Sequence, residues 1–226
     1  MNESWDISQV ETIAGAYDAR IQALPKRNTP NIRAVRREFT SKLKAAPPEV
    51  VLGLAMTLVH QYGYRGDAYE LLRYHKAAFE SLTEAQIEAL GEGIDSWWSV
   101  DGFARTISGP AWLEGLLGDE TIHRWARSDN LWWRRAALVS TVALNVRSRG
   151  GYGDVDRTLA VCRMLADDHE DMVVKALSWT LRELVVHDPD AVWDFLATYH
   201  DVLAARVKRE VNNKLETGLK NPRKST

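Results

Sequence analysis

The stretch SDNLWWRRAALVSTVALNVR, residues 128–147, predicts one long helix. Ser128 and Asp129 carry side-chain oxygens that can cap the free N–H groups of a first helical turn. Arg134 and Arg135 are adjacent, and neighbouring side chains of a helix point in different directions, so one can face inward while the other faces solvent.

Helical signals continue on both sides of this stretch, and strand signals are nearly absent. Segment 8–24, for example, has apolar residues at the spacing of one helix face. Thr29 with Pro30 is typical of a helix start, and Gly109-Pro110 predicts a break. The expected helices cover 8–24, 29–46, 49–62, 67–81, 83–90, 95–107, 110–117, 119–127, 128–147, 154–167, 170–187, 189–199 and 202–219.

Successive predicted helices fall into antiparallel pairs of roughly 35–45 residues, which is the period of HEAT or armadillo repeats. The pairs are not similar enough in sequence to prove a repeat, so a globular all-α bundle remains the alternative. We therefore predict an all-α chain with a single HEAT-like-repeat domain over residues 1–219 and a frayed basic tail over 220–226.

The composition is that of a soluble protein, with 45% hydrophobic and 27% charged residues. One cysteine, Cys162, excludes an internal disulfide and fits a reducing compartment. The beginning MNESWD is polar and acidic, and no apolar run approaches the roughly 20 residues that cross a bilayer. We expect a cytoplasmic monomer with no membrane contact.

Basic residues are gathered in three segments, although the net charge is −2. Residues 20–44, 124–149 and 205–224 carry net charges of +7, +5 and +5, which leaves −19 for the rest of the chain. If these segments share a face, that face could hold a phosphate backbone. The other interpretation is three unrelated solvated helix faces, and charge alone slightly favours it.

Three segments, 96–101, 128–137 and 173–183, place tryptophan beside charged residues, and in two of them the spacing is helical. Trp97 and Asp101 are four residues apart, and Trp179 and Arg182 are three apart. A single tryptophan on a helix usually belongs to the core. Several beside charges that are costly to bury are better explained by a cleft. The six histidines and one cysteine have no metal-ligand spacing, and no glycine-rich phosphate loop is present, so we expect neither a metal nor a cofactor.

Three blocks, SWWSVD (96–101), SDNLWWRRAA (128–137) and VVKALSWTLRE (173–183), resemble the signature blocks of the AlkD-like DNA glycosylases in order and spacing. These enzymes excise alkylated purines and are built from HEAT-like repeats. NTPNIR (28–33) and GDAYELLRYHK (66–76) resemble further segments of that family. The resemblance covers about residues 10–215. The sequence departs from the family at Trp98, where relatives often carry an acidic residue, and in its slightly negative net charge.

The resemblance implies a right-handed solenoid of HEAT-like helix pairs whose concave face clasps double-stranded DNA. It implies hydrolysis of the N-glycosidic bond of 3-methyladenine and 7-methylguanine, without a deep pocket for the flipped base. By matching position, the catalytic group would be Trp97, Asp101 and Trp179. The DNA contacts would be Arg135, Arg182, Asn28, Arg33 and Tyr17.

Two other functions remain open at the level of sequence. The chain could be a HEAT-like module that recognises DNA structure without excision, or a scaffold for protein partners. The complete set of Trp97, Asp101 and Trp179 favours the enzyme. No lysine stands between Trp97 and Asp101 to form a Schiff base, so we expect water to be the nucleophile.

Overall fold

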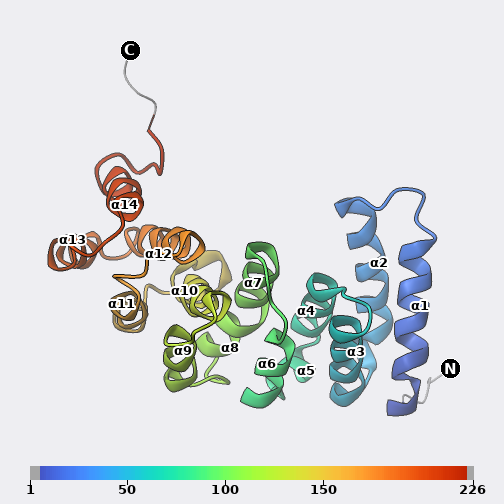
Figure 1. The fold of residues 1–226 in the computed structure, drawn as a ribbon. Helices are drawn as coiled ribbons and strands as arrows, with labels where there is room; N and C mark the ends of the chain where they lie inside the picture. The colour runs from blue at the N-terminus through green and yellow to red at the C-terminus, as the bar shows by residue number, and fades with distance from the viewer. Residues whose placement is uncertain (1–5, 223–226) are drawn as a thin grey trace. The chain divides into compact units, whose positions relative to one another are not determined.

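The computed structural model describes residues 6–222, and within that range every regular element is a helix (Figure 1). The chain divides into two compact units, residues 1–92 and 93–226. The predicted all-α class is confirmed. The single-domain assignment stays a prediction, and part of the predicted tail, residues 223–226, lies outside the described residues.

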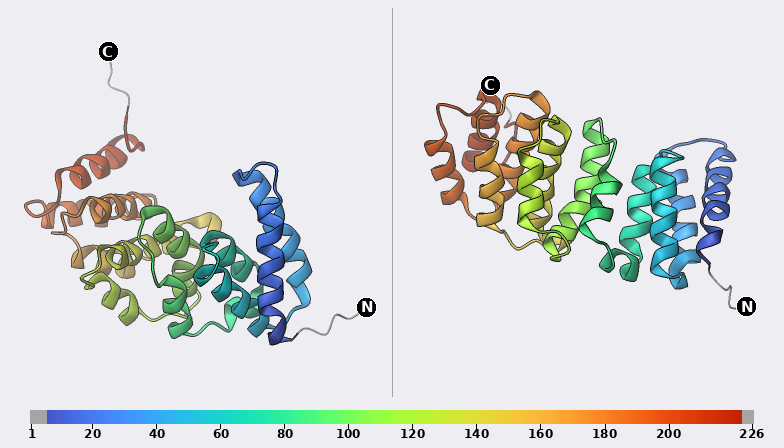
Figure 2. Two further views of the ribbon diagram at one scale, coloured as in Figure 1. Left: turned by 45° about the vertical axis from the view of Figure 1, so that its right-hand side comes forward. Right: turned by 60° about the horizontal axis from the view of Figure 1, so that its bottom comes forward.

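Within residues 6–92, unit 1 contains six α-helices and two 3₁₀ turns. They are η1 (Ile7–Gln9), α1 (Val10–Gln22), α2 (Thr29–Lys42), η2 (Leu43–Ala45), α3 (Pro48–His60), α4 (Arg65–Tyr74), α5 (Lys76–Glu80) and α6 (Glu84–Gly91). Helix α3 is the most apolar and packs against α1, α4 and α5, so it forms the centre of this unit. Figure 2 shows these helices side by side in the blue to teal part of the chain.

Unit 2 is built around the helix that the opening stretch predicts. Its elements are α7 (Trp97–Phe103), η3 (Ala104–Ser108), α8 (Gly109–Leu113), α9 (Asp119–Ala126), α10 (Leu131–Asn145), η4 (Arg147–Arg149), α11 (Val155–Met164), α12 (Asp171–Leu184), α13 (Pro189–Thr198) and α14 (Ala205–Thr217). Every residue of α10 from Arg135 to Asn145 is buried. Helix α10 packs against α7, α8, α9, α11 and α12, and α12 packs against α14, so helices far apart in sequence form one core.

Most predicted helix positions are confirmed, but some boundaries differ. The predicted helix 67–81 is two helices, because His75 adopts an extended backbone and its imidazole accepts the N–H of Ala78 to start α5. Helix α10 begins later than predicted, with Asn130 as its cap instead of Ser128 or Asp129. Asn28, rather than Thr29, caps α2.

The predicted break at Gly109-Pro110 is wrong. The helix runs on from α7 through η3, a π-helical turn, into α8, and the N–H of Gly109 reaches back to the carbonyl of Ala104. Pro110 has no N–H to donate, and a wider π turn accommodates the missing bond without ending the helix.

Gly109 is required where this helix crosses α10. A Cβ there would lie 2.7 Å from the carbonyl oxygen of Ala104, 2.9 Å from the Cβ of Ala143 and 2.9 Å from the carbonyl oxygen of Ser140. Two of these atoms are backbone and cannot rotate away. The crossing of α8 and α10 therefore depends on the missing side chain.

Gly109→Ala should lower the free energy of unfolding by about 2–3 kcal/mol, the usual range for forcing atoms into a packed core. The matched control is Gly102→Ala on the same continuous helix, where a Cβ meets nothing within 4 Å. That replacement should stabilise the helix by up to about 1 kcal/mol, because alanine has the higher helix propensity. Urea unfolding of both variants measures the difference, and equal effects would contradict the close crossing.

Candidate functional site

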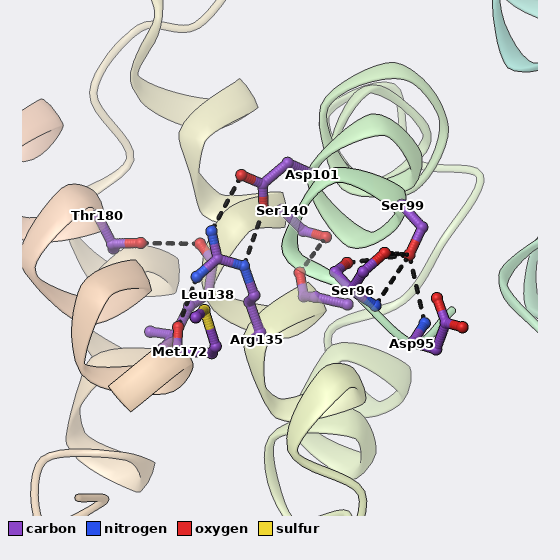
Figure 3. Close-up of polar contacts among 10 residues, drawn as sticks. Asp95, Ser96, Ser99, Asp101, Arg135, Leu138, Ser140, Met172 and Thr180 are labelled. Carbon is purple, nitrogen blue, oxygen red and sulfur yellow. Dashed lines mark hydrogen bonds and ion pairs between the residues drawn. The ribbon is translucent and has the colours of Figure 1, made fainter. Parts of the chain in front are cut away.

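Helix α7 presents the first predicted pair. The Ser99 hydroxyl accepts the N–H groups of Asp95 and Ser96, at 3.3 and 3.2 Å, and so fixes the start of the helix (Figure 3). Trp97 follows at the first helical position and is 57% exposed. Asp101 lies one turn later, with a side chain only 17% exposed. The helix thus holds an exposed indole above a largely buried carboxylate.

Asp101 is bound by Arg135 of α10 through a two-pronged ion pair. The Nε and Nη2 atoms of Arg135 donate to the two carboxylate oxygens at 2.9 and 3.0 Å. Its Nη1 donates to the carbonyl of Met172, at the start of α12, at 2.5 Å. Figure 3 shows the guanidinium between these two partners. Paired N–H···O bonds of this kind are strong and fix orientation.

The burial of Arg135 changes its expected role. Its residue exposure is 5%, and three of its donors already serve Asp101 and Met172. The main observed role of Arg135 is therefore to position the Asp101 carboxylate. A contact of Arg135 with a DNA phosphate stays a prediction. Each carboxylate oxygen of Asp101 spends one lone pair on Arg135, which leaves acceptor capacity for a water or a cationic substrate.

We expected one of the two adjacent arginines to face solvent. Arg134 is instead partly buried and makes several hydrogen bonds. Its Nε donates to Asp168 at 2.7 Å, and its Nη1 donates to the carbonyls of Ser128 and Asp129. Adjacent arginines of α10 thus form two separate ion pairs, one with an acid 34 residues later in the chain and one with an acid 34 residues earlier.

Trp179 and Arg182 both lie on α12 and are half-buried. The Trp179 indole N–H donates to Glu183 at 2.8 Å. Arg182 donates to the Ser178 hydroxyl, which in turn donates to the buried Glu210 of α14 at 2.7 Å. Burial lowers the pKa of Arg182, and the charges of Glu210 and Glu183 oppose that shift. Trp179 is thus fixed directly by Glu183, and Arg182 is linked to Glu210 through the Ser178 hydroxyl.

Two predicted DNA contacts lie at the start of α2 in unit 1. Asn28 is the N-cap, and its side-chain oxygen accepts the N–H of Asn31 at 3.0 Å. Arg33 is exposed, and no ion pair involves it within residues 6–222. Asn28 therefore has a structural task of its own, while the guanidinium of Arg33 is available to a partner.

Tyr17 is a correction. The resemblance implied a DNA contact, but the side chain is 0% exposed and packs edge-on against Phe39 and Tyr64 at centroid distances of 4.9 and 5.7 Å. Its hydroxyl makes no hydrogen bond of ordinary geometry within the described residues. Burial raises the pKa of this hydroxyl, and the nearby Asp67 carboxyl raises the same pKa further. The observed role of Tyr17 is to fill the core of unit 1.

Asp67, beside Tyr17, should make stability depend on pH. Burial raises its pKa to about 6. Between about pH 4 and 6 the folded state keeps a proton that the unfolded state releases, so the free energy of unfolding should fall as pH rises through this window. Asp67→Asn should remove that loss and stabilise the protein at pH 7 by on the order of 2 kcal/mol.

Urea unfolding at pH 4.5 and 7 tests this expectation. The control is Asp18→Asn in the same unit, because the Tyr64 hydroxyl lowers the pKa of Asp18 and the replacement should act in the opposite direction. Parallel pH profiles of Asp67→Asn and the wild type would contradict the assignment.

Arg105 and the acids Asp168, Glu183 and Glu210 also lie at or near the site, although the sequence alone does not point to them. Arg105 lies one turn beyond Asp101, and its guanidinium carbon is 5.7 Å from the centre of a Trp179 ring. The four-residue spacing from Asp101 was the available signal. The pairing of Asp101 with Arg135 joins residues 34 positions apart, and nothing local to either segment predicts it.

Within residues 6–222 no group of three or more histidine, cysteine or acidic side chains could hold a metal ion. In the same range no helix has the length and apolar character of a membrane span. A sequence model of the family described as DNA alkylation repair enzyme matches residues 27–215. The match includes every predicted site residue except Tyr17. No curated protein matches the chain.

Proposed function

The chain belongs to the family of DNA alkylation repair enzymes, and from that premise we propose that it is a monofunctional DNA glycosylase for cationic alkylated purines. Its substrates would be 3-methyladenine and 7-methylguanine in double-stranded DNA. The observation that carries the proposal is the Asp101 carboxylate, fixed by a buried arginine beside an exposed indole.

Alkylation at N3 or N7 makes the purine formally cationic, and this weakens its bond to the sugar. When that bond breaks, its electron pair goes to the base, which leaves neutral and needs no acid. Positive charge develops on the sugar, as in glycoside hydrolysis. A preorganised carboxylate stabilises this charge and can accept a hydrogen bond from the attacking water. The water adds to C1′, loses a proton, and leaves an abasic site.

The two tryptophans would border the nucleotide. The faces of Trp97 and Trp179 can contact the sugar and the cationic base, with cation–π contacts worth about 0.5–2 kcal/mol each. Glu183 holds the Trp179 indole through its N–H, so this ring needs little reorganisation when DNA binds. Arg182, Asn28 and Arg33 would contact the DNA backbone, and Arg135 would do so through its remaining donors.

We also propose that the helices stack as a right-handed HEAT-like solenoid with the DNA on its concave face. The packing within unit 2 supports this arrangement. Helix α9 packs against α11, and α10, α12 and α14 pack in succession, as the two layers of stacked helix pairs do.

A monofunctional mechanism forms no covalent bond between enzyme and DNA. Each lysine that the structure describes in unit 2 has its ammonium group bound: Lys175 to Asp171, Lys208 to the His200 carbonyl, Lys214 to the Gly218 carbonyl and Lys220 to Glu210. A lysine engaged in this way is a poor amine nucleophile.

The test uses a duplex oligonucleotide with one 7-methylguanine. The wild type should release the free base and leave the strand unbroken until alkali cleaves the abasic site. Borohydride should trap no protein–DNA adduct. A trapped adduct would overturn the monofunctional mechanism. Binding without release of either 7-methylguanine or 3-methyladenine would instead assign the chain to structure-specific DNA binding.

A further inference from the structure

The π-helical turn η3 places an arginine beside the candidate site. Arg105 lies on η3, four residues after Asp101, which is about one turn further along the same continuous helix. Its side chain is exposed, while its carbonyl accepts a hydrogen bond from Arg149 at 3.0 Å. The backbone of Arg105 is therefore anchored, while its side chain remains accessible to solvent.

The guanidinium of Arg105 packs on Trp179. The distance of 5.7 Å from guanidinium carbon to ring centroid lies within the range of cation–π contacts. Asp101 is the nearest acid along the helix, and both of its oxygens accept hydrogen bonds from Arg135. No ion pair involves Arg105 anywhere in residues 6–222. A stacked guanidinium keeps its N–H donors at its edges, which suits an oxyanion ligand.

A cation at this place would oppose catalysis if it faced the sugar alone, because the sugar becomes positive in the transition state. An anion between the Arg105 guanidinium and the sugar removes this repulsion. Each sugar in DNA is bonded to phosphates on both sides. A nucleotide whose C1′ lies at Asp101 therefore brings a phosphate within reach of a long side chain one turn away.

We propose that Arg105 is a substrate-positioning residue that binds the phosphodiester next to the nucleotide whose glycosidic bond is cleaved. The inference rests on the proposed function, since it needs a nucleotide at Asp101. The inference gives two residues of this helix different roles. Asp101 contacts the sugar, and Arg105 binds the adjacent phosphodiester of the DNA beside Trp179.

The experiment measures the affinity for a duplex that contains one tetrahydrofuran abasic analogue, over a range of KCl concentrations. The loss of one phosphate contact should make the slope of log affinity against log salt concentration less negative by about 0.9. Arg105→Gln should show this change and bind roughly 8-fold more weakly at 0.1 M salt. Arg105→Lys keeps the charge and should retain the wild-type slope.

The matched control is Arg163→Gln on α11, which removes the same charge from an exposed arginine on another helix. It should leave the slope unchanged. The proposal is overturned if Arg105→Gln keeps the wild-type slope, if Arg163→Gln flattens it equally, or if Arg105→Lys behaves like the glutamine variant. The last result would mean that the charge at position 105 does not make the phosphate contact, and that Arg105 supports contacts made by other residues through its packing on Trp179.

The same data separate this inference from the proposed function. A wild type that releases 7-methylguanine while Arg105→Gln keeps its slope would refute the phosphate contact and leave the glycosylase intact. A wild type that neither binds the duplex at low salt nor releases the base would refute both.

Discussion

Asp101→Asn should lower the single-turnover rate of 7-methylguanine release by about 100-fold to 1000-fold, the loss expected when one preorganised electrostatic group is removed from a transition state. The replacement keeps the shape of the side chain and removes its charge. It also turns an amide N–H₂ group toward Arg135. Both groups are hydrogen-bond donors only, so they cannot bond to each other. The chemistry and the local packing are therefore both disturbed.

A control must separate these two effects. Asp168→Asn breaks the other aspartate–arginine pair of α10, where Arg134 and Asp168 are 18% and 11% exposed. Both variants should lose comparable stability, but Asp168→Asn should excise at nearly the wild-type rate. Excision is compared at a temperature where circular dichroism shows both variants folded. Equal losses of activity, or wild-type activity of Asp101→Asn, would sink the assignment of Asp101.

The second large effect concerns Arg135. Arg135→Met should lower the free energy of unfolding by about 3–5 kcal/mol, because it leaves the Asp101 carboxylate without its charged partner in a largely buried place. The carbonyl of Met172 loses its donor as well. Arg135→Lys should recover little of this, since one ammonium cannot bridge two carboxylate oxygens and a carbonyl as a guanidinium does.

A double-mutant cycle in urea measures this coupling. The variant Asp101→Asn with Arg135→Met should be more stable than the sum of the single losses predicts, by about 1–3 kcal/mol. It should remain inactive. Strictly additive losses would show that the ion pair contributes no coupling energy, and the positioning role of Arg135 would then be wrong.

The helices could be predicted because their signals are local. The apolar spacing and flanking breaks of α10, α12 and α13 lie within each segment, and the structure confirms these helices to within a few residues at each end. The Gly109-Pro110 prediction failed for a non-local reason. The missing N–H is accommodated by a π turn, and the glycine allows a close crossing with residues 31 and 34 positions later in the chain, Ser140 and Ala143.

The candidate site divides in the same way. The pairing of Trp97 with Asp101 follows from helical spacing within one segment. The ion pair of Asp101 with Arg135 depends on how α7 meets α10, which no local pattern contains. Tyr17 shows the limit of matching short segments, because an aromatic at the expected position can belong equally to a core or to a surface.

The Asp101–Arg135 pair also has an evolutionary consequence. A lineage that lost the acid alone would keep a buried, unbalanced guanidinium, and one that lost the arginine alone would keep a buried carboxylate. Either single step costs stability before any new function can compensate. Selection on folding should therefore retain or discard the two residues together.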